Sequence, residues 1–253
     1  MKFTKIISIA LCIVLLLAMF AGCQKENEAE VLLKKAGLQM LDKQFAMTMT
    51  MDYSCDDAEL DAALSAVSAS KIEMIVDGKN VKMDMTVLDQ KVTVLCVNEV
   101  VYMDMFGMKV KSFLEAEDYA EMFGEINEMA DMDLEEFKSV EIIDNADGGK
   151  TVICHGFDDD LASALTENAG DLDEILNIEI KEDSAKVTIV LDKNGNFASI
   201  SLDMTMVMLV LNRGDVTVDA SLDYAFDYTK GEKLSYPADA DQYGTIDPDW
   251  LTQ

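Results

Sequence analysis

The residue types that most often carry catalysis are scarce in this sequence. His155 is the only histidine, and it directly follows Cys154. This pair could bind copper, but a copper site would need methionines clustered around it, and a single histidine on a strand is more typical of a structural role. The sequence contains no nucleophile elbow, metal-protease motif or P-loop. Carboxylates are so frequent that no pair stands out as a catalytic dyad. We therefore expect no enzyme, no metal site and no cofactor.

Methionine is the residue whose number is unusual, with 18 in the chain. Its thioether side chain is flexible and polarizable, so a methionine-lined surface adapts to apolar ligands of different shapes. The same flexibility also suits an ordinary packed core, and the sequence leaves both interpretations open. The residues that we predict to line a ligand-binding face are Met49, Met51, Met74, Met83, Met85, Met204, Met206, Met208, Tyr224 and Phe226.

The first residues of the chain form a different chemical signal. Lys2 and Lys5 precede an apolar run that ends at Phe20, and Ala21-Gly22-Cys23 follows. This resembles a bacterial lipoprotein signal, in which the chain is cut before a cysteine that becomes diacylated. The resemblance implies that residues 1–22 are removed and that Cys23 carries diacylglycerol and fatty acyl chains such as palmitate. It places the protein at the extracytoplasmic face of a cell membrane. The apolar run is too short to be read as a transmembrane helix of the mature chain.

The chain is strongly acidic, with 49 acidic and 20 basic residues and a formal net charge of −29. Since the signal segment carries two lysines and no acid, the formal charge from Cys23 onward is −31. Nucleic acid is excluded as a partner, because phosphate binding needs a basic face. Electrostatic adhesion to anionic lipid is also unfavourable, so the acyl anchor would have to hold the protein at the membrane.

Three cysteines remain once Cys12 leaves with the signal and Cys23 is lipidated. Cys55, Cys96 and Cys154 lie on three different predicted strands, and none forms a Cys-x-x-Cys motif. Their spacing allows one disulfide, whose pairing the sequence does not reveal, or three free thiols.

Alternation of apolar and polar residues predicts the strands that would bring the methionines onto one face. Residues 197–229 give the strongest signal, because even-numbered residues are apolar along both arms of one long hairpin. Asp77-Gly78 and Lys193-Asn194-Gly195 are typical of hairpin turns. Shorter strands are predicted at 45–53, 71–76, 81–87, 92–96, 101–105, 137–144, 150–157 and 187–191.

Helical spacing of apolar residues occurs within 32–41, 57–68, 119–130 and 161–176. A sheet with one apolar face must bury that face, and these helices are the available cover. We therefore predict an α+β fold with a strongly curved, mostly antiparallel half-barrel sheet of about nine or ten strands. Three or four helices would pack on its concave face. Residues 23–44 would form the lipidated N-terminus, tether and first helix, residues 45–237 a single domain, and residues 238–253 an acidic tail.

The order of these segments resembles a known group of proteins. The matching stretches are GKNVKMDM and VLCVNEVVYMDM, then VTIVLDKNGNFASISLDM, VTVDASLDYAFDY and a final SYP, within residues 30–237. They resemble small bacterial lipoproteins of unknown function that share the half-barrel of the lipoprotein-carrier (Lol-type) and mycobacterial lipid-carrier folds. The resemblance implies a monomeric, non-enzymatic carrier that holds a lipid or other hydrophobic ligand in the concave face. The alternative is a cell-surface interaction module with a packed core and an acidic partner-binding face.

Overall fold

The computed structural model of the chain describes residues 28–61, 71–87, 90–114, 134–158, 178–210 and 214–246. Within these ranges the chain forms one sheet of thirteen strands, the helix α2 (Glu28–Leu41) and a second helix that begins at residue 58. Three short 3-10 helices also occur: η1 (Leu134–Glu136), η3 (Glu182–Ser184) and η4 (Ala240–Gln242). The strands are β1 (Gln44–Cys55), β2 (Ile72–Asp77), β3 (Asn80–Val87), β4 (Gln90–Val97), β5 (Val100–Met105), β6 (Met108–Phe113), β7 (Phe137–Asp144), β8 (Lys150–Phe157), β9 (Ile178–Ile180), β10 (Lys186–Leu191), β11 (Phe197–Val210), β12 (Gly214–Asp227) and β13 (Gly244–Thr245).

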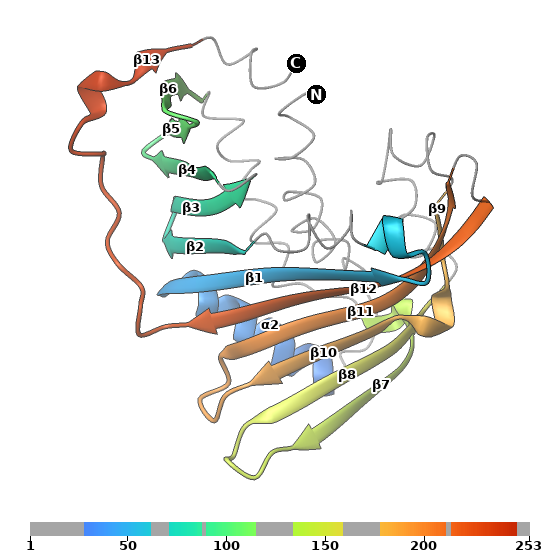
Figure 1. Ribbon diagram of the computed structural model, residues 1–253. Helices are drawn as coiled ribbons and strands as arrows, with labels where there is room; N and C mark the ends of the chain where they lie inside the picture. The colour runs from blue at the N-terminus through green and yellow to red at the C-terminus, as the bar shows by residue number, and fades with distance from the viewer. Residues whose placement is uncertain are drawn as a thin grey trace.

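The sheet is one continuous surface with β1 and β12 near its middle (Figure 1). The strand order is β13-β6-β5-β4-β3-β2-β1-β12-β11-β10-β8-β7, and β9 pairs with β11 outside this path. All pairings are antiparallel except that of β13 with β6. The direction of the strands rotates from β2–β6 to β7–β8, as expected for the twist of a large sheet.

The predicted fold class is wrong in its strand and helix content. Strands β6, β9 and β13 were not predicted; β9 and β13 span three and two residues, too few to show a period. Instead of three or four helices on a concave face, the described part of the chain contains α2 and the start of the helix at residue 58. The helices predicted within 119–130 and 161–176 lie outside the described residues. The fold is therefore mostly β rather than an α+β half-barrel.

Helix α2 covers part of the apolar face of the sheet. Its buried residues recur at helical spacing and form one stripe: Ala29, Leu33, Ala36, Gly37 and Met40. They belong to the same core cluster as apolar residues of β1, β8, β10, β11 and β12. In the view of Figure 1 the helix lies behind β1, β12, β11 and β10. Glu28 and Glu30 in its first turn favour this helix start, because they complement the positive end of the helix dipole.

The second helix begins where the sequence predicts. The Oδ1 atom of Asp57 accepts hydrogen bonds from the backbone N–H groups of Glu59 (3.1 Å) and Leu60 (3.0 Å). Asp57 thus satisfies two donors that a helix start leaves without partners. The remainder of the predicted helix, residues 62–68, lies outside the described residues.

The chain after β12 runs along the ends of β2–β5 and reaches β6, where β13 adds to the sheet edge (Figure 1). Leu234 donates its backbone N–H to the carboxylate of Asp77 (2.8 Å). The ring of Tyr102 on β5 meets the rings of Tyr236 and Tyr243 edge-on, with centroids 6.1 and 5.2 Å apart. We call residues 228–246 the C-terminal segment. It buries the second face of β5, which explains why Val100, Val101, Tyr102 and Met103 are consecutive buried residues.

Candidate functional site

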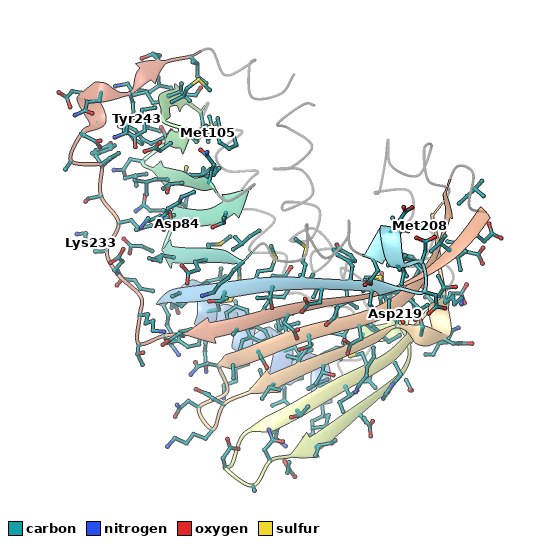
Figure 2. All side chains as sticks on the ribbon, in the orientation of Figure 1. Asp84, Met105, Met208, Asp219, Lys233 and Tyr243 are labelled. Carbon is teal, nitrogen blue, oxygen red and sulfur yellow. The ribbon has the colours of Figure 1, made fainter. Side chains whose placement is uncertain are left out.

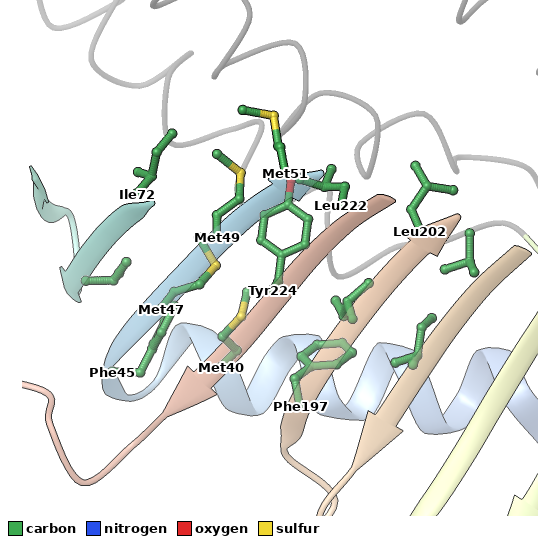
Figure 3. Close-up of a cluster of buried hydrophobic side chains, with 14 of the residues drawn as sticks. Met40, Phe45, Met47, Met49, Met51, Ile72, Phe197, Leu202, Leu222 and Tyr224 are labelled. Carbon is green, nitrogen blue, oxygen red and sulfur yellow. The ribbon is translucent and has the colours of Figure 1, made fainter. Parts of the chain in front are cut away.

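The pairing of the long strands places the predicted ligand-binding residues on a single face. Tyr224 on β12 lies opposite Met49 on β1 and opposite Ile200 on β11. Met51 lies opposite Leu222 on the same side of the sheet. Figure 3 shows Met49, Met51, Leu222 and Tyr224 gathered on this side of β1 and β12. We call this apolar side of β3, β2, β1, β12 and β11 the methionine face.

The methionine face continues across β2 and β3 in two rows. Met47 on β1 lies opposite Met74, which lies opposite Met83. In the neighbouring row Ile72 lies opposite Met85. Side chains directly opposite one another on adjacent antiparallel strands are in contact distance, so each row is a contiguous strip of apolar side chains. Met47 belongs to the row of Met74 and Met83, although it was not among the predicted ligand-binding residues.

The ten predicted residues do not form one compact site. Met208 belongs, with Val216 and Val218, to a second, smaller buried cluster against which Met206 packs. The other predicted residues lie in or against the main core. Figure 2 shows the separation, since Met208 lies at the far end of the long hairpin from Asp84 of β3. Met206 and Met208 are therefore remote from the strip formed by Met74 and Met83.

Burial divides the predicted residues into two kinds. Met49, Met51, Met85, Met208 and Tyr224 are at most 8% exposed and behave as core side chains. The half-buried residues are Met74, Met83, Met204, Met206 and Phe226. Burial raises the pKa of Tyr224 above its ordinary value, so its phenol is neutral at physiological pH.

A buried serine hydroxyl interrupts the apolar side of the meander strands. Ser112 on β6 is fully buried, opposite Val101, and its hydroxyl has no hydrogen-bond partner among the described residues. A buried hydroxyl without a partner is unfavourable and calls for a specific explanation. Ser112 was not predicted, because a single serine in a strand carries no signal of its own.

The opposite, polar side of the same strands carries a groove of about 500 Å³. Its residues are Ala46, Met47, Thr48, Glu73, Met74, Ile75, Lys82, Asp84, Ala225, Phe226, Asp227 and Lys230. Strands β1, β2 and β12 each contribute three consecutive residues, and the middle one points to the methionine face because strand side chains alternate. The groove floor therefore consists of backbone and small side chains such as Ala46 and Ala225, with charged residues around it.

The charges around this groove are already paired. Asp84 lies 3.3 Å from the ammonium of Lys82 and 3.2 Å from that of Lys91, and it accepts a hydrogen bond from Thr93. Asp227 pairs with Lys230 at 3.1 Å. The groove is thus close to neutral in a strongly acidic chain, and sequence patterning offered no signal for it.

Three cysteines and the histidine lie in the described part of the chain. The sequence left open whether Cys55, Cys96 and Cys154 form one disulfide or remain three free thiols. In the structure all three are free thiols. Burial raises the pKa of Cys96 to about 11 and that of Cys154 to about 12, which keeps both thiols protonated and unreactive. The Nε2 atom of His155 lies 3.1 Å from a carboxylate oxygen of Glu141 in an exposed position. Within the described ranges no three metal-binding side chains come together.

The turn that the sequence predicts before the long hairpin is present in the structure. The Asp192–Asn196 segment is a hairpin turn, as predicted, with Asp192 accepting hydrogen bonds from the backbone N–H groups of Asn194 (2.8 Å) and Asn196 (2.9 Å).

Cys23, the predicted lipidation site, lies outside the described residues. Of the helices in the described part of the chain, none has the length and apolar character needed to span a bilayer.

Comparison with known proteins gives little. No protein-family model matches the sequence, and no curated protein matches it. Among solved structures, the crystal structure of LprF from Mycobacterium bovis is similar with a TM-score of 0.37 and 13% sequence identity. The similarity covers 85% of this chain and 98% of LprF. At this TM-score and identity nothing about the present chain is inferred from LprF.

Proposed function

We propose that the protein is a membrane-anchored extracytoplasmic lipoprotein that binds a lipid or another hydrophobic ligand on its methionine face. The observation that carries this proposal is the apolar strip around Met74 and Met83, which stays half-buried beside a fully buried core. Binding would be driven by burial of apolar surface. It requires no covalent chemistry, so the proposal assigns no enzymatic activity and no cofactor.

The membrane anchor in this proposal is the diacylglycerol on Cys23. Its support is the sequence from Lys2 to Cys23, with a basic start, an apolar run and small residues before the cysteine. An acidic chain of charge −31 from Cys23 onward would not adhere to anionic lipid as a whole. Covalent acyl chains would hold it at the membrane as a monomer.

The decisive test is native mass spectrometry of the chain from Gln24 onward, purified from a bacterial host that secretes it. This chain retains every described element, since the described residues begin at position 28. We expect a stoichiometric adduct that organic extraction removes and whose mass matches a lipid. A bare protein that also fails to take up fluorescent fatty acids would contradict the binding proposal.

A double variant, Met74→Gln with Met83→Gln, tests whether the methionine face is the binding surface. Glutamine resembles methionine in size, but its amide must give up water when a ligand covers it. That loss costs about 1–3 kcal/mol, so we expect the affinity for a fatty acid probe to fall about tenfold or more. The control is Met108→Gln, because Met108 is 57% exposed near the sheet edge and should leave affinity unchanged. Equal affinities in both variants would place the ligand elsewhere.

The alternative function is a cell-surface interaction module with a packed core and an acidic partner-binding face. The observation that favours an interaction module is the groove on the polar side, whose size is within the usual range for ligand sites. The groove itself has paired charges, so the acidic part of such a face would be the polar surface around it. In that case the chain would carry no lipid, and replacing Ala225 in the groove floor with a bulky residue would reduce capture of a surface partner. If the methionine face binds lipid instead, the same replacement would leave fatty acid binding unchanged.

A further inference from the structure

One row of apolar side chains on the methionine face is more exposed than the row beside it. It crosses five strands from β12 to β4 through directly opposed residues, namely Phe226, Met47, Met74, Met83 and Val94. Met47 is 8% exposed and the other four are half-buried. The neighbouring row is fully buried, at 6% exposure or less, and consists of Tyr224, Met49, Ile72, Met85 and Val92. We call the first set the half-buried row.

The length and width of the half-buried row match one extended acyl chain. On its other side Phe45, Val76 and Cys96 are buried, so most of the accessible apolar surface is one residue wide. Four strand spacings of about 4.8 Å give the row a length of roughly 19 Å. In a zigzag of C–C bonds of about 1.5 Å, about 15 carbons cover that distance. Met103, opposite Val94 on β5, is 1% exposed and ends the accessible part.

The β12 end of the row carries a buried hydroxyl group. Tyr228 follows Phe226 by two residues, and its ring lies 5.7 Å from that of Phe45 between centroids. Among the described residues the Tyr228 hydroxyl has no hydrogen-bond partner. Burial and, to a smaller extent, the carboxylate of Asp192 raise the pKa of Tyr228 to about 12, so the phenol keeps its proton at physiological pH. A ligand oxygen that accepts this proton in a hydrogen bond would remove the cost of a buried, unpaired hydroxyl.

A second donor lies beside this hydroxyl. The ammonium of Lys43 is 5.3 Å from the centre of the Tyr228 ring, and it donates a hydrogen bond to the side-chain oxygen of Asn196. Lys43 is half-buried, and no carboxylate of the described residues pairs with it. The preceding residue, Asp42, is exposed. Since an ammonium has three N–H donors, Lys43 can bind a ligand oxygen while it keeps its contact with Asn196.

The acidic side chains near this end are bound to other partners. The carboxylate of Asp192 accepts four hydrogen bonds, from the backbone and side-chain N–H groups of Asn194 and Asn196. Asp227 pairs with Lys230 at 3.1 Å. What selects the ligand here is therefore a pair of hydrogen-bond donors next to an apolar row, and a net positive charge is not required.

We propose that the half-buried row binds one linear acyl chain of about 15 carbons, whose terminal carbonyl oxygen accepts hydrogen bonds from Tyr228 and Lys43. The tail crosses β1, β2 and β3 toward Val94, and the flexible thioethers of Met74 and Met83 pack along it. A lipid with two acyl chains does not fit, because the neighbouring row is already buried. This inference rests on the proposed function, since it names the class of ligand that the methionine face would bind. A free fatty acid and a monoacylglycerol share this chemistry.

The first experiment locates both ends of the ligand on the chain from Gln24 onward. One photoreactive analogue of palmitic acid carries a diazirine at the end of its tail, and another carries it beside the carboxyl group. Peptide mass spectrometry after illumination should find the tail analogue on Met83 or Val94 and the other analogue on Phe45, Phe226 or Tyr228. The reverse pattern, or labels outside these strands, would overturn the assignment. Absence of labelling in a protein that carries another hydrophobic adduct would overturn this inference alone, whereas a protein that binds no hydrophobic probe would also overturn the proposed function.

The second experiment measures affinity by equilibrium dialysis with palmitic acid, monopalmitoylglycerol and dipalmitoylphosphatidylcholine. We expect the two-chain lipid to bind at least tenfold more weakly than the tighter of the two single-chain ligands, and that tighter ligand identifies the source of the chain. Equal binding of the two-chain lipid would overturn the single-chain inference and leave the proposed function standing.

Two variants then test the donors at the β12 end. Tyr228→Phe keeps the ring contact with Phe45, and Lys43→Met keeps the unbranched side chain; each should weaken binding of the single-chain ligand at least fivefold. The matched control is Lys193→Met, which removes an exposed positive charge from the neighbouring turn and should leave the affinity unchanged. An equal loss in Lys193→Met would assign the effect to general electrostatic attraction and overturn the role of the two donors. Unchanged affinity in both Tyr228→Phe and Lys43→Met would overturn it as well.

Discussion

The two halves of the sheet bury their apolar residues in different ways. In the hairpin half, formed by β1, β12, β11, β10, β8 and β7, one face is apolar and α2 lies on part of it. The polar face of this half is held together by hydrogen bonds between opposite strands, such as that from Thr205 to Asp219 at 2.7 Å. In the meander half, formed by β2–β6, the C-terminal segment also buries part of the second face. The hairpin half is thus a one-sided sheet, whereas β5 is buried on both sides.

This difference shows where a flexible binding surface can exist. The residues of β5 from Val100 to Met103 are all at most 8% exposed and have no room to adapt. At the junction of the two halves, Met74 and Met83 remain half-buried and keep the conformational freedom of methionine. A ligand surface at this junction would have adaptable methionine side chains between two regions of well-packed core.

The substitution Tyr102→Ala should have the largest effect, because it removes the ring that holds the C-terminal segment against the meander half. Tyr102 is 6% exposed and contacts both Tyr236 and Tyr243. Truncation of a buried aromatic residue costs about 3–5 kcal/mol, and we expect a loss of that size in urea unfolding. Tyr102→Phe keeps both ring contacts and should stay within about 1.5 kcal/mol of the original protein. A loss below about 1 kcal/mol for the alanine variant would mean that the segment does not stabilise this half.

The substitution Leu33→Ala tests the cover of the hairpin half in the same way. Leu33 is 1% exposed on the buried stripe of α2, so its truncation leaves a cavity and should cost about 2–5 kcal/mol. Leu38→Ala is the matched control on the same helix, because Leu38 is 56% exposed and should change the free energy of unfolding by about 0.5 kcal/mol or less. Similar losses in both variants would show that α2 is not docked through this stripe.

The substitution Ser112→Ala should stabilise the meander half when no ligand is bound. In the described part of the chain the buried hydroxyl of Ser112 has no partner, and its removal relieves a penalty of about 1–3 kcal/mol. Thermal unfolding should therefore shift to higher temperature. Ser139→Ala on β7 is the control, since Ser139 is exposed and should cause no measurable shift. A lower midpoint for Ser112→Ala would indicate that the hydroxyl has a stabilising partner in solution.

The sequence predicted the strands better than it predicted their cover. The period of two placed ten strands, including both arms of the long hairpin, because alternation depends only on neighbouring residues. The cover of the meander half depends on contacts between Tyr102 and residues more than 130 positions later, which no local pattern records. For this reason β13 and the burial of β5 on both faces were missed.

For the candidate residues, the sequence predicted the face of the sheet on which they lie but not their positions along the strands. Parity along β1, β2, β3, β11 and β12 placed all ten residues on one face, which the pairing confirms. Position along the strands was not predicted, so Met206 and Met208 were grouped with residues that lie in a different cluster. The polar groove was missed because its floor depends on how β12, β1 and β2 align, and that register becomes visible only when the strands pair.

The smallest predicted effect concerns Asp227, at the point where the hairpin half passes into the C-terminal segment. Its carboxylate accepts hydrogen bonds from the hydroxyl (2.6 Å) and backbone N–H (2.9 Å) of Thr229 and pairs with Lys230, and these partners lower its pKa to about 2. A carboxyl group with a lowered pKa stabilises the fold at pH values above its ordinary pKa of 3.8 and loses that contribution as the pH falls toward 2. Asp227→Asn should therefore be slightly less stable than the original protein at pH 6, and the difference should shrink as the pH falls from about 4 to 2. Because the Asp227 side chain is 37% exposed and its charge is screened by water, the effect should be near the detection limit of chemical unfolding. If the difference in stability stays constant over this pH range, it does not depend on the charge of Asp227. The altered hydrogen bonds of the amide would then be its cause.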